Sequence, residues 1–184
     1  MCRYALKKYK PHYVCFDCRK TFKQTIIEDI IVRNGDWDFY WLLNYSRNKP
    51  KVEKFKKNHP EILERFEKEY ENKIYKCPDC AKEMHSIGMD FKAPKKDKIK
   101  EWEIVKSMYK LGNTFHTCGC SGPGYIPHNP KDYLIYLENR KVEYETNLHE
   151  RSEDLSTEEK NKYISYWKTK LDLLNSEIQI QNIR

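Results

Sequence analysis

The sequence predicts an α+β fold: a small antiparallel sheet with a helical insertion, followed by a C-terminal antiparallel helical hairpin. Two Cys-x-x-Cys pairs, Cys15/Cys18 and Cys77/Cys80, each lie within strand-like sequence. Apolar residues recur at helical spacing between the pairs and after the second one, through to the end of the chain. We therefore expect one α+β domain, followed by a separate hairpin. The expected boundaries are 1–130 and 131–184.

The composition limits the size of the hydrophobic core. Only 39% of the 184 residues are hydrophobic, 34% are charged, and the mean hydropathy is −0.95. Such a chain buries less apolar surface than usual, so a structural staple would help it to fold. No apolar run approaches the roughly 18 residues of a membrane span, and the N-terminus lacks the apolar stretch of a secretory signal. These features predict a cytoplasmic protein without membrane contact.

Three segments of the first domain are predicted to form strands. Residues 3–24 and 74–91 each predict a strand on either side of a cysteine turn. The apolar and aromatic segment between them, residues 25–45, contains an Asn-Gly pair that suits the positive φ of a tight turn and predicts a hairpin. Asp36 and Asp38 alternate just after this turn, which favours a solvated strand face.

Two helices are expected in the same domain. The first covers residues 58–73 with Pro60 in its first turn, and we expect its apolar face to pack on the sheet. The second covers residues 95–113, with Gly112 as its C-terminal cap. The first face comprises Ile62, Leu63, Phe66 and Tyr70, and the second comprises Ile99, Trp102, Val105 and Tyr109.

The last third of the chain predicts two long helices joined by a short polar loop. Ser156 with Glu159 three positions on is a capping box, which marks the start of the second helix. The apolar stripe of the first helix comprises Leu134, Leu137, Tyr144 and Leu148, and that of the second comprises Tyr163, Trp167, Leu171, Leu174 and Ile178. Such a hairpin either packs on the first domain or projects as an arm.

The two Cys-x-x-Cys pairs form the strongest functional signal. Two such turns supply the four thiolates that structural zinc prefers, and a closed shell of this kind leaves no position for substrate. The chain has seven cysteines, an odd number, and in a reducing compartment this spacing favours metal over disulfides. We predict that Cys15, Cys18, Cys77 and Cys80 bind one Zn²⁺, and a redox role of the pairs is the competing interpretation.

The segments around the two pairs, residues 12–24 and 74–87, resemble the zinc-ribbon superfamily. In that superfamily, two knuckles on β-hairpins clamp one zinc ion. The resemblance covers less than a fifth of the chain, and the long segment between the pairs departs from the common pattern. It implies a zinc-stabilised sheet, and zinc ribbons commonly act in translation and transcription.

A second cluster of metal-ligating and nucleophilic residue types lies at His116, Cys118 and Cys120. On a strand these alternate residues face the same side. Three interpretations remain open: a second metal site, buried structural thiols, or a reactive pair with a lowered thiol pKa. A second metal site needs a fourth ligand, for which the candidates are Cys2, His12, His85 and His128.

Positive charge gathers in the first domain. The net charge is +7, although residues 131–184 hold 9 basic and 11 acidic side chains. Lysines alternate with aromatic residues in residues 3–13 and 91–100, a pattern that suits phosphate contact with base stacking. The expected ligand is nucleic acid, with RNA favoured. The candidate contacts are Arg3, Lys7, Lys8, Lys10, Arg19, Lys20, Lys95, Lys96 and Lys98.

Together these features predict a non-enzymatic zinc-binding adaptor that contacts RNA or a ribonucleoprotein. The helical hairpin is expected to engage a protein partner or to dock on the first domain. Two alternatives stay open. One is a protein-binding regulatory or host-defence module without nucleic-acid contact. The other is a thiol-based enzyme or redox sensor at Cys118 and Cys120. The sequence contains no metalloprotease, P-loop or dinucleotide fingerprint.

Overall fold

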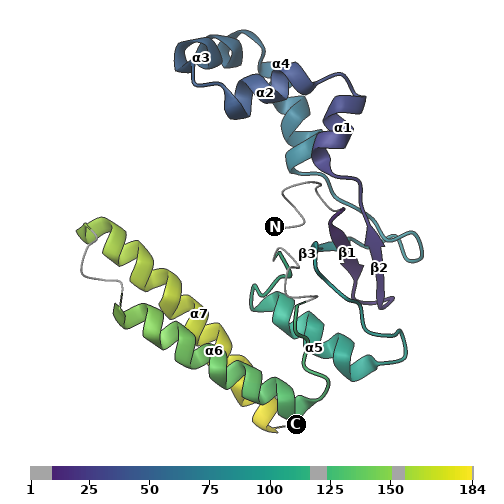
Figure 1. Cartoon of the computed structure of the whole chain (residues 1–184), viewed down its shortest axis with the longest axis vertical. Helices are drawn as coiled ribbons and strands as arrows, with labels where there is room; N and C mark the ends of the chain where they lie inside the picture. Colours follow the sequence, from purple (N-terminus) through teal and green to yellow (C-terminus); the bar gives the residue numbers. More distant parts are fainter. Residues whose placement is uncertain (1–9, 117–123, 151–155, 184) are drawn as a thin grey trace, which may run out of the picture. The chain divides into compact units, whose positions relative to one another are not determined.

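The computed structural model describes residues 10–116, 124–150 and 156–183, and these fall into two compact units. The first unit comprises residues 10–91 with His116, and the second comprises residues 92–115 and 124–183. The described residues form one three-stranded antiparallel sheet and seven α-helices, which confirms the α+β class (Figure 1). None of the described helices has the combination of length and apolarity that crossing a membrane requires.

The sheet is built around the first cysteine turn. Strand β1 (His12–Cys15) pairs antiparallel with β2 (Lys20–Lys23) on one side and with β3 (His85–Gly88) on the other. The β1–β2 hairpin confirms the two strands predicted around the first cysteine pair. We call the strands and both cysteine turns, residues 12–23 and 75–88, the sheet region.

The second cysteine segment forms less strand than predicted. Before its cysteines there is only an isolated bridge between Lys76 and Glu83, closed by a hydrogen bond from the Met84 N–H to the Tyr75 carbonyl at 2.7 Å. After the turn the chain continues into β3, where it pairs with β1 rather than with its own preceding segment. The two cysteine turns therefore meet on a shared sheet.

Between the two cysteine turns the chain forms a cluster of helices (Figure 1). We call residues 27–71 the helical insertion. The helix predicted over residues 58–73 is confirmed as an α-helix followed by a π-helical turn. Its elements are α1 (Ile27–Arg33), α2 (Trp37–Tyr45), α3 (Lys49–Asn58), α4 (Pro60–Phe66) and the π-helical turn η2 (Glu67–Glu71).

The apolar face of α4 and η2 packs against other helices rather than on the sheet, so the predicted contact with the sheet is wrong. Phe66 and Tyr70 are buried against Ile31 of α1. Partly buried side chains from α1, α2 and α4 complete the cluster. The helical insertion thus has a hydrophobic core of its own.

The predicted hairpin over residues 25–45 is also wrong, because this segment forms α1 and α2. Gly35 has a φ of 77°, but it ends a helix instead of turning a hairpin. The Gly35 N–H donates to the Val32 carbonyl at 3.1 Å, and the Asp36 N–H donates to the Ile31 carbonyl at 3.0 Å. This pair of bonds is a Schellman motif. An Asn-Gly pair is compatible with a tight turn and with a helix end, and here it follows the helix α1.

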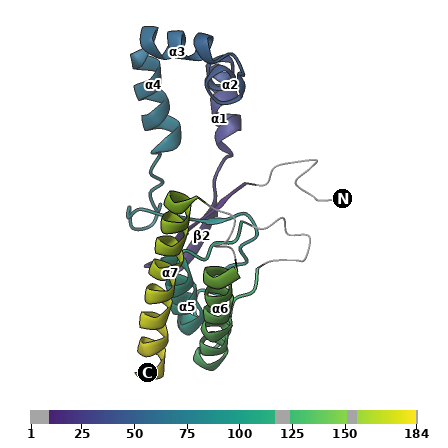
Figure 2. The same cartoon turned by 90° about the vertical axis from the view of Figure 1, so that its left-hand side faces the viewer.

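The second unit contains the three helices predicted from residue 95 onward. They are α5 (Ile99–Lys110), α6 (Pro130–Glu150) and α7 (Thr157–Ile183). Helices α6 and α7 lie side by side as the predicted helical hairpin (Figures 1 and 2). The hairpin packs on α5, where the Tyr133 hydroxyl lies 2.7 Å from the Ser107 hydroxyl oxygen and the Lys170 ammonium donates to the Leu111 carbonyl at 3.0 Å.

Both predicted helix ends in this unit are present. Gly112, with a φ of 78°, closes α5 in a second Schellman motif. The Glu159 carboxylate accepts from the Ser156 N–H at 3.1 Å, which forms the expected capping box before α7. One residue of the predicted α5 face is misplaced: Ile99 is 52% exposed, and Ile104 is buried instead.

Candidate metal centre

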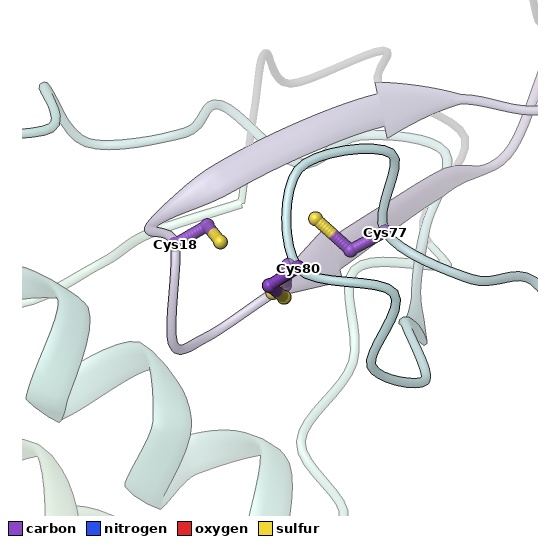
Figure 3. A group of neighbouring side chains, drawn as sticks. Cys18, Cys77 and Cys80 are labelled. Atoms are coloured by element: carbon purple, nitrogen blue, oxygen red, sulfur yellow. The ribbon is translucent and has the colours of Figure 1, made fainter.

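The four cysteines of the two pairs converge on one small volume. Their sulfur atoms all lie within 4.8 Å of one another, and Figure 3 shows three of the side chains converging from the two turns. The Sγ atoms of Cys15 and Cys80 are 3.6 Å apart, which is well beyond a disulfide bond. Cys15 and Cys77 are each 2% exposed, Cys18 is half-buried and Cys80 is exposed. The group is therefore anchored in the protein but reachable from solvent.

The two turns share one local sequence, Cys-x-Asp-Cys-x-Lys, and one backbone shape. The residue after each second cysteine adopts the left-handed conformation: φ is 52° at Arg19 and 59° at Ala81. This conformation turns the chain back, and the N–H of Ala81 then donates to the Cys77 carbonyl at 2.8 Å. Because the same residues recur at the same spacing, the two turns present their sulfurs in matching ways.

The shared sequence also links the turns to each other by two reciprocal ion pairs. Lys82 of the second turn contacts Asp17 of the first at 2.7 Å, and Lys20 beside the first turn pairs with Asp79 of the second. Each hydrogen-bonded carboxylate raises the pKa of its lysine. These pairs are exposed, so they contribute little stability but help to fix the register between the turns.

The environment acts differently on the individual thiols. Hydrogen bonding to Cys80, together with burial, raises the pKa of Cys18 to about 12. Burial opposes ionisation of Cys77, but hydrogen bonds from the backbone N–H groups of Asp79 and Cys80, together with those from the Cys15 and Cys80 side chains, lower its pKa to about 7. Burial raises the pKa of Cys15. The backbone donors thus stabilise a thiolate at Cys77, the form that binds metal.

A set of four sulfur ligands at this spacing can hold a metal ion. Thiolates select soft or borderline ions, and oxygen-seeking ions such as Mg²⁺ and Ca²⁺ are poorly suited to the site. In the part of the chain that the structure describes, no other group of three or more His, Cys, Asp or Glu side chains brings its potential ligand atoms this close together.

No family model matches the chain, and neither does any curated protein or solved structure. The interpretation of the cysteine centre therefore depends on its own geometry.

Of the predicted cluster of His116, Cys118 and Cys120, the structure describes only His116. His116 is exposed, while Cys118 and Cys120 lie outside the described residues. Two histidines considered as its fourth ligand belong to the sheet. His12 meets Phe91 edge to face, and burial lowers the His12 pKa; His85 stacks on Phe16. The structure leaves the three interpretations of this cluster as predictions.

The residues predicted to contact nucleic acid differ in exposure and in pairing, and three of them are not described by the structure. Arg3, Lys7 and Lys8 lie outside the described residues. Lys10 is exposed in the first unit, whereas Lys20 is engaged with Asp79. The remaining candidates are the half-buried Arg19 and the exposed Lys95, Lys96 and Lys98 of the second unit.

Asp36 is buried, whereas the sequence predicts it on a solvated strand face. It is buried at the junction of α1 and α2, where both carboxylate oxygens accept from Arg65 at 2.6 and 2.7 Å. The Tyr70 hydroxyl donates to the same carboxylate at 2.6 Å. These donors, led by Arg65, lower the Asp36 pKa against the opposing effect of burial. The expected solvated strand face is therefore wrong, since the segment is helical and its aspartate faces inward.

Proposed function

We propose that the four cysteines bind one structural Zn²⁺ and that the sheet region is a zinc-ribbon-like scaffold. The observation that carries this proposal is the convergence of four sulfurs within 4.8 Å. Tetrahedral zinc with Zn–S bonds of about 2.3 Å places neighbouring sulfurs about 3.8 Å apart. The 3.6 Å separation of Cys15 and Cys80 is compatible with that arrangement.

The zinc would stabilise the fold and would not take part in a reaction. A four-thiolate shell is closed, so no position remains for water or substrate. When bound, the ion would supply cross-links between the two turns. The chain's own contribution is to orient the sulfurs through the left-handed residues Arg19 and Ala81 and to align the turns through the ion pairs.

On this scaffold we propose a non-enzymatic adaptor that contacts RNA or a ribonucleoprotein in the cytoplasm. The excess of basic side chains in residues 1–130 supports the proposal, as does the exposure of Lys10, Lys95, Lys96 and Lys98. The hairpin of α6 and α7 is the proposed surface for a protein partner, and its exposed apolar side chains support this. They include Ile135, Val142, Tyr166, Leu173 and Ile180.

Elemental analysis tests the metal. We expect one zinc per chain, lost in Cys77→Ser and retained in the matched variants Cys118→Ser and Cys120→Ser. A fall from two zinc ions to one in either matched variant would instead place a second metal site at that segment. A folded wild-type protein that contains no metal contradicts the proposal.

Fluorescence polarisation with single-stranded RNA tests the nucleic-acid contact. Reversing the charge of Lys7, Lys8, Lys95 and Lys96 together should abolish binding. Reversing four other lysines, Lys106, Lys110, Lys131 and Lys168, changes the net charge equally and should weaken binding far less. The wild-type affinity should fall steeply with salt. In a plot of the logarithm of the binding constant against the logarithm of the salt concentration, each phosphate contact contributes a slope of about −0.7 for single strands.

The same preparations distinguish the alternatives. Protein partners that remain bound after nuclease treatment and high salt, with no RNA binding by the pure protein, favour the protein-binding module. Alkylation of Cys118 or Cys120 at neutral pH, well below the ordinary thiol pKa, favours the thiol-based enzyme or redox sensor.

A further inference from the structure

We propose that a hollow in the second unit binds one nucleotide, with lysines on the phosphate and Tyr125 stacked on the base. The hollow has a volume of about 400 Å³, within the usual size of ligand pockets. One wall comes from the segment before and within α5, from Lys92 to Glu101, and the other from Gly124 to His128. The nucleotide has two potential sources, a nucleic-acid strand and a free nucleotide. For the strand, this inference deepens the proposed function and rests on it.

Three lysines line the first wall: Lys92, Lys95 and Lys98. Among the described residues, none of the three has an acidic side chain within 4.0 Å, whereas Lys20 and Lys82 near the cysteines are paired. Unpaired ammonium groups around one hollow attract an anion with several oxygens, and phosphate is the common biological example.

The lysine wall is held in shape by the core beneath it. The indole Nε1–H of Trp102, a side chain only 3% exposed, donates to the Lys95 carbonyl at 3.2 Å. The Lys98 N–H donates to the same carbonyl at 3.0 Å, closing a turn. The backbones of Lys95 and Lys98 are therefore held before a ligand arrives, which lowers the entropic cost of binding.

The opposite wall is also fixed. A Cβ at Gly124 would collide with the ring of Phe115, so this position requires glycine. Pro127 is fully buried, and the chain then enters α6 through Asn129, whose side chain accepts from the Asp132 N–H at 2.9 Å. Between these fixed points Tyr125 lines the hollow; it is 59% exposed, and its ring lies 6.3 Å from the ring of Tyr136 in α6.

An exposed aromatic ring beside unpaired lysines indicates the class of ligand. Inorganic phosphate has no planar group that can stack on the ring, while a nucleotide has both a phosphate and a planar base that stacks on tyrosine. The Glu101 carboxylate lies at the same hollow, 3.7 Å from the His128 imidazole. A carboxylate only accepts hydrogen bonds, so it favours an exocyclic amino group, which has two donors, over uracil, whose one N–H donor lies between two carbonyl oxygens.

Calorimetric titration with AMP, CMP, UMP and inorganic phosphate tests the site on the full-length, zinc-loaded protein. We expect AMP and CMP to bind about threefold more tightly than UMP, and phosphate to bind more weakly than any of them. Tyr125→Ala and Lys92→Glu should each weaken AMP binding about tenfold. Matched exposed residues elsewhere in the unit, in Tyr166→Ala and Lys106→Glu, should change it less than about twofold.

The outcomes distinguish failure of the proposed nucleotide site from failure of the proposed RNA adaptor. AMP binding that depends on Tyr125 and Lys92, without binding of single-stranded RNA, supports a site for free nucleotides and overturns the RNA adaptor. RNA binding that is unchanged in both pocket variants supports the adaptor and overturns the hollow as its nucleotide site. Equal binding of phosphate and AMP, or equal effects of the pocket and control variants, overturns this inference. Thermal melts of each variant show whether the fold is retained.

Discussion

The first unit contains two regions whose buried clusters differ in composition. The buried cluster of the sheet region consists of Cys15, Cys77 and Met84, so two of its three buried side chains are the candidate metal ligands. The buried cluster of the helical insertion consists of Ile31, Phe66 and Tyr70. Six partly buried apolar side chains surround it, and Asp36 and Arg65 form an ion pair beside it.

From this difference we expect the two regions to depend on different interactions for their stability. Val14 and Ile87 of the sheet region are also fully buried, and we expect the ion that its cysteines are proposed to bind to reinforce this small core. The helical insertion buries apolar side chains and the Asp36 carboxylate, and the candidate metal ligands lie outside its buried cluster. Removing the metal and breaking the buried ion pair should therefore damage different parts of the protein.

Metal removal should have the largest effect. A strong chelator, or the substitution Cys77→Ser, should unfold the sheet region while the helical insertion keeps its helices, since structural zinc contributes on the order of 10 kcal/mol to such sites. Hydrogen exchange read peptide by peptide measures both regions in one sample. Cys118→Ser is the matched control and should leave both protected. Equal loss of protection in both regions would contradict their independence.

Breaking the ion pair of Asp36 and Arg65 should destabilise the helical insertion and leave the sheet region folded. Asp36→Asn leaves Arg65 without its charged partner and should lower the free energy of unfolding of the helical insertion by about 2 kcal/mol. That figure lies below the usual range for buried pairs because the Arg65 side chain is 39% exposed. Zinc content should not change. The exposed neighbour Asp38→Asn is the control and should cost less than about 0.5 kcal/mol.

The same pair should make the helical insertion sensitive to acid. The folded-state pKa of Asp36 is lowered, so its contribution is fully present above the unfolded-state pKa of about 4 and is lost as the pH falls through the folded-state value. In chemical denaturation, the stability difference between wild type and Asp36→Asn should shrink below about pH 4. A difference that stays constant from neutral pH to pH 2 would exclude this titration.

The hydroxyl of Tyr70 should contribute less than the ion pair. It donates to Asp36 and accepts from the Asn34 amide at 3.0 Å, and the ring remains packed when the hydroxyl is removed. Tyr70→Phe should therefore cost about 1.5 kcal/mol. In Asp36→Asn the same substitution should cost less, because the charged acceptor has gone. A double-mutant cycle measures this coupling, and strict additivity would contradict the contact.

The sequence predicted the parts of the fold that local signals determine. Each Cys-x-x-Cys turn sets the separation of its two sulfurs, so four converging thiols could be expected without knowledge of the intervening chain. Helices α5, α6 and α7 follow from long apolar periodicity, and Gly112 and Ser156 mark their ends.

Non-local contacts account for the main errors. The burial of Asp36 depends on Arg65 and Tyr70, which lie 29 and 34 residues further along the chain. Helix α3 was not predicted because few apolar side chains, such as Phe55 against Phe39, mark its inner face among many lysines. The hairpin error is local: both a tight turn and a helix end accept glycine with a positive φ, and α1 is too short to show a long periodicity.

That shared requirement for a positive φ gives the smallest and sharpest test of the comparison. The helical insertion places Gly35 at a φ of 77°, whereas the second cysteine turn places Ala81 at 59°. A Cβ at position 35 would meet no atom within 4 Å, so Gly35→Ala should cost only the backbone strain, about 1 kcal/mol. Ala81→Gly should stabilise the zinc-loaded sheet region by about 0.5 kcal/mol, because relief of strain is partly offset by the greater entropy of glycine in the unfolded chain.

Urea denaturation of the zinc-loaded protein, followed separately in each region by hydrogen exchange, measures both substitutions. Opposite signs are expected, with Gly35→Ala affecting only the helical insertion and Ala81→Gly only the sheet region. Destabilisation by Ala81→Gly would mean that the alanine methyl group supports the turn. In that case the strain at the left-handed residue would not limit the stability of the sheet region, and the ion pairs of Asp17 and Asp79 would be the next contacts to vary.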